Sequence, residues 1–283
     1  MKSGDRVIII GNSYVYNGNA VVNIRNSEKR QSARENDHGY FYQLCKANGI
    51  DVNVTNWCFG GHGLADLFAQ PCSRKECDSC RHEEFLRDRY YDYVIVSPGG
   101  GARQESTIKD DFDSIISFFR AANPDVVIVC LGNLGARGYS SFGTVHPGVY
   151  EYYPTLRSKG VIIADWGEVV SGITNGVYTV HGANEAYCKS SFIVDDGFHP
   201  NPLSGYIAAL TAYCAITGES AVGQPRSFFS DALLCEGFDM EKYTARFYRG
   251  ESNFMQIMNS DSDMRGIALL IDQVVAKYTS STR

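Results

Sequence analysis

Five short runs of mostly apolar, often β-branched residues constrain the fold of this chain most strongly. We expect them to be strands at residues 6–10, 52–57, 93–96, 126–131 and 161–165. Nearly continuous apolar runs of this length are typical of parallel strands that are buried on both faces. Segments with helical periodicity alternate with or follow these strands at residues 108–122, 203–217 and 264–278. This alternation predicts a three-layer α/β/α fold, a flavodoxin-like, five-stranded parallel sheet between helices.

Two segments interrupt the strand–helix pattern, and we expect both to be loops inserted at strand ends. Residues 70–89 are rich in Cys and charge, whereas residues 135–154 are rich in Gly and Tyr. The aromatic side chains of the second segment could contact a substrate, or they could bury the loop against the scaffold. We expect residues 1–220 to form one domain and residues 221–283 to form a helical C-terminal extension packed on it.

Polar and Gly-rich segments follow several of the predicted strands. Ser13 follows the first strand, residues 60–63 follow the second, residues 99–104 follow the third, and Asp196 and His199 follow the last. Open parallel sheets bind ligands outside the carboxyl ends of their strands, so these segments should meet at one edge. An acid and a His three residues apart could then orient and polarise a Ser, as nucleophilic catalysis requires.

Each of these features alone also has a structural interpretation. Gly-Asn-Ser after a strand is a common turn composition, so Ser13 could be only a turn residue. Asp196 could cap a helix or close a loop, and His199 could be a polar loop residue. Asp195 is a rival for the role of the acid. The prediction of an active site depends on the convergence of the separate features.

Three blocks of the sequence resemble the SGNH (GDSL-type) hydrolases, in particular a bacterial branch that has Gly-Asn-Ser in its first block. The blocks are residues 7–13, 54–63 and 195–201, and the resemblance covers roughly residues 6 to 220. It implies that Ser13 is the nucleophile, His199 the general base and Asp196 the residue that orients His199. It also implies that the backbone N–H groups of Ser13 and Gly61 form an oxyanion hole.

The third block departs from the family pattern, because Gly101 stands where the family has an Asn that completes the oxyanion hole. Loss of one such donor typically lowers the rate by about 10²–10³. A backbone N–H of Gly100 or Gly101 could replace it, since Gly lets the main chain approach closely. The side chain of Arg103 or Gln104 could also reach the site. Alternatively, the site is weakened or no longer catalytic.

The resemblance implies serine-dependent hydrolysis of a carboxylic ester, with a small acyl group such as acetyl removed from a carbohydrate or a related substrate. The alternatives are an O-acyltransferase with the same triad and a catalytically weakened binding protein. None of these functions requires a cofactor for catalysis.

Cys72, Cys77 and Cys80, with His82 just beyond them, form a second chemical pattern. Cys ligands at such spacings can bind a structural Zn²⁺ or part of an iron–sulfur cluster. His82, His62 or Cys58 would have to supply a fourth ligand to zinc. The segment could instead be a Cys-rich surface loop.

Charge and cysteine usage limit the partners and the compartment. The net charge is −6 and the chain lacks a basic tract, so we expect no nucleic acid and no anionic membrane as partner. No apolar run approaches the ~18 residues of a membrane span. Nine scattered cysteines suit a reducing cytoplasm better than a disulfide framework. The N-terminal residues lack the long apolar core of a signal peptide, which also predicts a cytoplasmic location.

Overall fold

A computed structural model gives the fold of the chain. It describes residues 1–16, 21–22, 36–58, 63–64, 90–98, 105–132, 147–194, 196–197, 199–226 and 253–279, and the statements below concern these residues.

Five parallel strands form one sheet in the order β2-β1-β3-β4-β5. The strands are β1 (Arg6–Gly11), β2 (Asn53–Cys58), β3 (Tyr93–Val96), β4 (Val127–Leu131) and β5 (Ile162–Ala164). β1 lies inside the sheet, where Val7 is paired with Val54 of β2 and with Tyr93 of β3. All five predicted strands are therefore confirmed, with ends that differ by at most one residue.

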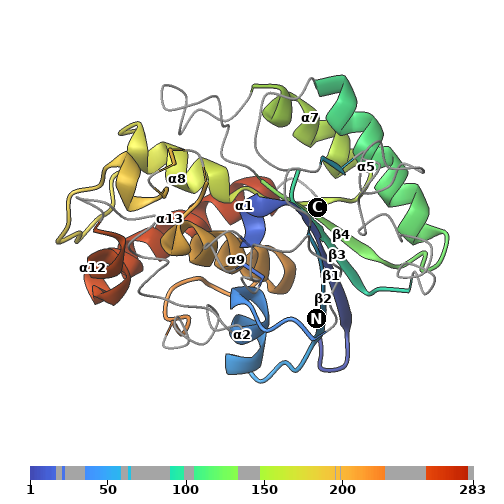
Figure 1. Cartoon of the computed structure of the whole chain (residues 1–283), viewed down its shortest axis with the longest axis horizontal. Coiled ribbons are helices and arrows are strands. Elements are labelled where there is room, and N and C mark those ends of the chain that lie inside the picture. The colour runs from blue at the N-terminus through green and yellow to red at the C-terminus, as the bar shows by residue number, and fades with distance from the viewer. Residues whose placement is uncertain are drawn as a thin grey trace.

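Alternate residues of the strands face two separate hydrophobic cores, which makes the fold a three-layer α/β/α sandwich (Figure 1). Val7 and Ile9 face the core that is covered by helices α2, α8, α9, α12 and α13. Ile8 and Ile10 face the core that is covered by α5 and α7. The first group of helices spans Tyr40–Ala47, Trp166–Thr174, Pro202–Thr217, Phe254–Asn259 and Asp261–Thr279, and α5 and α7 span Glu105–Arg120 and Pro147–Ser158. The predicted fold class is confirmed.

Helix α9 lies at the centre of its layer, in contact with β4, β5, α2, α8, α12 and α13. The sequence pattern predicts an apolar stripe on this helix, but every residue from Pro202 to Ala215 is buried. The small residues Gly205, Ala208, Ala209 and Ala212 let neighbouring elements approach the helix from several sides. This central helix directly follows the predicted Asp196–His199 segment, and it anchors that segment to the core.

Helix α7 corrects the prediction that residues 135–154 form a loop, because residues 147–158 are helical. Pro147 occupies the first helical position, where a missing N–H costs nothing, but Pro154 lies inside the helix. Burial of Tyr152, Tyr153 and Leu156 in the core beneath the helix outweighs the hydrogen bond that Pro154 cannot donate. Residues 135–146 and the predicted loop at 70–89 lie outside the described part of the chain.

The C-terminal helix α13 packs against α8, α9 and β5. Its penultimate residue Tyr278 contacts both hydrophobic cores, so the end of the chain closes the sheet beside β5. Among the described helices, none combines the length and the apolar character that a membrane crossing requires.

Candidate active site

Ser13 lies on a sharp turn between β1 and the short helix α1 (Ser13–Tyr16). Asn12 shapes this turn, because its side-chain Oδ1 accepts a hydrogen bond from the N–H of Tyr14 at 3.1 Å and its carbonyl accepts one from Val15 at 3.0 Å. Gly11 is needed for the close packing there, since a Cβ atom on it would lie 3.1 Å from the Cβ of Ser97. The turn thus presents the Ser13 hydroxyl at the carboxyl end of β1.

Asp196 and His199 lie on a tight loop whose two ends are paired by an isolated antiparallel bridge between Ile193 and Pro200. The N–H of Val194 donates to the carbonyl of His199 at 3.0 Å, and the N–H of Gly197 donates to the carbonyl of Val194 at the same distance. Gly197 has a φ of +83°, a left-handed conformation that glycine adopts without steric cost. The loop therefore has a backbone conformation that positions both functional side chains.

The three predicted triad residues meet at the carboxyl end of β1. The distance from His199 Nε2 to Ser13 Oγ is 2.8 Å, and that from His199 Nδ1 to Asp196 Oδ2 is 2.6 Å. Asp196 also fixes the loop itself, because its Oδ1 accepts the backbone N–H of His199 at 3.0 Å. The side chains of His199 and Asp196 are 13% and 28% exposed, so solvent and a substrate can reach them. The arrangement can remove a proton from Ser13 and transfer it to His199.

The first turn of α9 anchors the loop that carries His199. Asn201 caps the helix by accepting the N–H of Ser204 at 3.1 Å, and its own side-chain NH₂ donates to the carbonyl of Ser191 at 2.8 Å. The hydroxyl of Ser204 donates to the carbonyl of Phe192 at 2.6 Å. Asn201 and Ser204 are completely buried, so these hydrogen bonds are shielded from water and resist displacement of the loop.

Tyr14 is a neighbour of the triad that the sequence reasoning missed. Its ring lies 5.4 Å from the imidazole of His199, measured between centroids, and is tilted by 43°. Burial, and to a lesser degree the negative charge of Asp196, raises the pKa of Tyr14, so its hydroxyl stays neutral. The Tyr14 ring covers one side of the imidazole. Its position directly after Ser13 was the only available signal, and an apolar Tyr-Val-Tyr run is more typical of a core.

Several known structures resemble this one, although no protein-family model and no curated protein matches the sequence. A protein of the DUF4886 family from Bacteroides uniformis is 16% identical with a TM-score of 0.50, over 96% of this chain and 95% of that one. A candidate SGNH hydrolase from Slackia heliotrinireducens is 17% identical with a TM-score of 0.49, over 74% and 97%. For a carbohydrate esterase family 3 protein from Talaromyces cellulolyticus, the values are 13%, 0.46, 76% and 97%.

The strand order, the Ser after β1 and the Asp–His loop before α9 agree with the fold that the sequence blocks imply. The three-layer fold is consistent with that of the SGNH hydrolases, which the sequence blocks resemble. At the identities found here, the likeness to solved structures concerns the fold alone. The chemistry of this chain is therefore argued from its own residues.

The remaining predicted site residues lie outside the described part of the chain. These are Gly61, Gly100, Gly101, Arg103 and Gln104 for the oxyanion hole, Asp195 as the rival acid, and Cys72, Cys77, Cys80 and His82 for the metal. Their roles stay predictions. Within the described ranges, no group of three or more His, Cys, Asp or Glu side chains is arranged to hold a metal ion. Tyr152 and Tyr153, from the aromatic segment, are buried in the core beneath α7.

Proposed function

We propose that the protein is a serine-dependent hydrolase of carboxylic esters. The observation that carries the proposal is the continuous set of hydrogen bonds from Asp196 through His199 to Ser13, with heavy-atom distances of 2.6 and 2.8 Å. A Ser hydroxyl is a weak nucleophile by itself, and it is activated when an adjacent base accepts its proton. Ser13 and His199 are 186 residues apart in the sequence, so a local turn cannot account for their contact.

In the proposed reaction, Ser13 Oγ attacks the ester carbonyl while His199 Nε2 accepts the hydroxyl proton. Asp196 holds Nδ1 protonated and stabilises the imidazolium cation that forms. The tetrahedral intermediate expels the alcohol, which takes the proton from Nε2, and leaves an acyl group on Ser13. His199 then deprotonates a water molecule, which releases the carboxylic acid and regenerates the Ser hydroxyl.

The N–H groups of Ser13 and Gly61 are proposed to bind the developing oxyanion, with a further donor from Gly100, Gly101 or Gln104. The resemblance of the sequence blocks favours a small acyl group, such as acetyl, on a carbohydrate. We further propose a cytoplasmic location, which is supported by the buried thiols of Cys45, Cys130 and Cys214, none of which forms a disulfide among the described residues.

The direct test is labelling with a fluorophosphonate, which reacts with activated serines, followed by intact-mass measurement. Wild type should gain one adduct, whereas Ser13→Ala and His199→Ala should gain none. His181→Ala is a matched control, because His181 is exposed and remote from Ser13 in the sequence, and it should label like wild type.

Absence of an adduct on folded wild type would contradict the proposal and favour a binding protein that retains the fold. Where labelling succeeds, acetylated sugars and p-nitrophenyl acetate would identify the substrate. Added sugar alcohols should not outcompete water as acceptors. If they did, the protein would be an acyltransferase with the same acyl-enzyme.

A further inference from the structure

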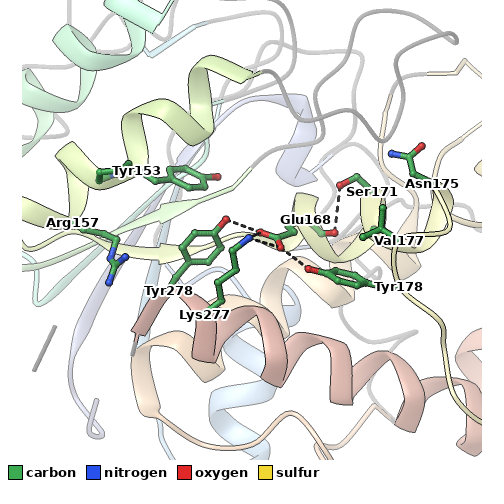
Figure 2. A pocket seen from close by; sticks show the side chains of 11 residues that line it. Tyr153, Arg157, Glu168, Ser171, Asn175, Val177, Tyr178, Lys277 and Tyr278 are labelled. Atoms are coloured by element: carbon green, nitrogen blue, oxygen red, sulfur yellow. Dashed lines mark hydrogen bonds and ion pairs between the residues drawn. The ribbon is translucent and has the colours of Figure 1, made fainter. Parts of the chain in front are cut away.

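A cavity of about 480 Å³ lies beside β5, at the edge of the sheet (Figure 2). Its walls come from α7, from α8 with the turn after it, and from the end of α13, and its main side chains are Tyr153, Arg157, Glu168, Tyr178, Lys277 and Tyr278. This volume is typical of a small-molecule site. Strands β3 and β4 lie between β1 and β5, which separates the cavity from the strand carrying Ser13 by about 14 Å at ~4.8 Å per strand.

Glu168 organises the cavity rather than offering its carboxylate to a ligand. The hydroxyls of Tyr178 and Tyr278 donate to it at 2.5 and 2.6 Å, and Lys277 Nζ donates to its two oxygens at 2.8 and 2.9 Å. Burial opposes ionisation, but these hydrogen bonds outweigh it and lower the pKa of Glu168. Four donors fill the carboxylate's acceptor sites, so Glu168 fixes the positions of three other lining side chains.

The cavity has an excess of positive charge although the chain as a whole carries −6. Glu168 neutralises Lys277, but Arg157 is half-buried and no ion pair to it is found among the described residues. An Arg guanidinium carries five N–H donors in a planar fork that matches a carboxylate or a phosphate. An unpaired, half-buried guanidinium at the wall of a cavity therefore favours an anionic ligand.

Tyrosine rings provide the apolar part of the cavity wall. The rings of Tyr153 and Tyr278 meet edge to face at a centroid distance of 5.4 Å. Tyr178 lies directly against α8, where a Cβ atom on Gly172 would approach its ring to 2.1 Å, so any larger residue at 172 would displace the wall. Ring faces beside hydroxyl, ammonium and guanidinium groups suit a ligand ring with apolar faces and polar edges.

We propose that this cavity is a second ligand site, which binds a sugar-sized ring bearing one carboxylate or phosphate. Arg157 pairs with the anionic group, and Tyr178 and Tyr278 contact the body of the ring. Lys277 Nζ directs two donors to Glu168 and keeps a third N–H, which can reach a ligand oxygen. The site is independent of the esterase chemistry proposed for Ser13.

Isothermal titration with four probes tests the ligand class. D-Glucuronate and glucose 6-phosphate carry the anion and the ring, whereas D-glucose lacks the anion and inorganic phosphate lacks the ring. We expect one saturable site for at least one anionic sugar, with glucose and phosphate bound at least about tenfold more weakly. The tighter anionic sugar identifies the preferred anion. Ser13→Ala should bind as wild type does, which separates this site from the triad.

Charge variants test the location. Arg157→Gln should weaken binding of the anionic sugar by about tenfold or more, whereas Arg265→Gln, at an exposed position of α13 outside the cavity, should change it less than about twofold. Val177 lines the rim and is 73% exposed, so substitutions there spare the core. Val177→Glu should weaken binding, and Val177→Lys should strengthen it.

Four results would overturn the proposal. The first is absence of saturable binding for both anionic sugars. The second is equal affinity of wild type and of a folded Arg157→Gln variant, with folding checked by circular dichroism. The third is glucose binding as tightly as glucuronate, and the fourth is identical affinities of the two Val177 variants. Fluorophosphonate labelling of the same samples reports on Ser13 separately, so failure of either proposal leaves the other measurable.

Discussion

Asp165 should make the stability of this protein decrease as the pH rises toward neutrality. The residue follows β5, is completely buried, and caps α8 by accepting the N–H of Glu168 at 3.1 Å. Burial, followed by repulsion from the Glu168 carboxylate, raises the pKa of Asp165 from 3.8 to about 7, although the capping N–H and other groups, including the distant Lys277, oppose the rise. Substitution by Asn keeps the capping oxygen and removes the titration.

The sign and the size of the effect follow from this pKa. Between about pH 4 and pH 7 the native state binds a proton that the unfolded chain has released, so the free energy of unfolding falls as the pH rises through this window. At about 1.4 kcal/mol per pKa unit, the total loss above pH 7 is at most about 4 kcal/mol. Asp165→Asn should therefore be more stable than wild type by about 2–4 kcal/mol at pH 8, and within about 1 kcal/mol of it at pH 5.

Urea unfolding followed by tryptophan fluorescence measures this difference, because both Trp57 and Trp166 are buried in the native state. The quantity to compare is the difference in free energy of unfolding between variant and wild type at each pH, since other groups also titrate in this range. Asp110→Asn, at an exposed carboxylate on α5, is the control and should change stability by less than about 0.5 kcal/mol at either pH. An Asp165→Asn variant that is equally destabilised at pH 5 and pH 8 would refute the reasoning.

Two further predictions concern the triad and its support. Asp196→Asn should lower kcat on p-nitrophenyl acetate by about 10⁴, because Asn no longer holds Nδ1 of His199 protonated, and an unchanged kcat would remove Asp196 from the mechanism. Asn201→Ala should cost about 1–3 kcal/mol in urea unfolding, because it removes the cap on Ser204 and leaves the carbonyl of Ser191 without its donor.

The sheet was predictable because its strands are encoded locally. Val7, Ile8, Ile9 and Ile10 are all buried, since a parallel strand with a helical layer on each face has no polar side. Once the sheet is parallel, the carboxyl ends of its strands must share one edge, and this rule places Ser13 and the segment after β5 at the same edge. Together with the resemblance of the sequence blocks, it predicted the contact between Ser13 and His199 without knowledge of any loop conformation.

Features that depend on packing between distant elements were not predictable. In the sequence, Glu168 is an ordinary acidic residue of a helix. Its partner Lys277 lies 109 residues later, and only the packing of α13 brings the two together. Helix α7 has a proline in its interior, and its stability comes from burial of Tyr152 and Tyr153 rather than from local propensity. Tyr14 could not be assigned to the site because an apolar Tyr-Val-Tyr run is more typical of a buried core segment than of an active site.

The distance between Ser13 and His199 depends on the rigidity of two separate elements, because the two residues lie far apart in the sequence. β1 carries Ser13, and Gly11 at the end of this strand packs closely against Ser97. The buried hydrogen bonds of Asn201 fix the loop that carries His199. An error of about 1 Å in the distance between nucleophile and base can cost about 10² in rate. Asn201→Ala should therefore reduce kcat by more than its effect on stability implies, at temperatures where the variant remains fully folded. If kcat instead stays at the wild-type value, the remaining contacts of the loop, which include the bridge between Ile193 and Pro200, suffice to position His199.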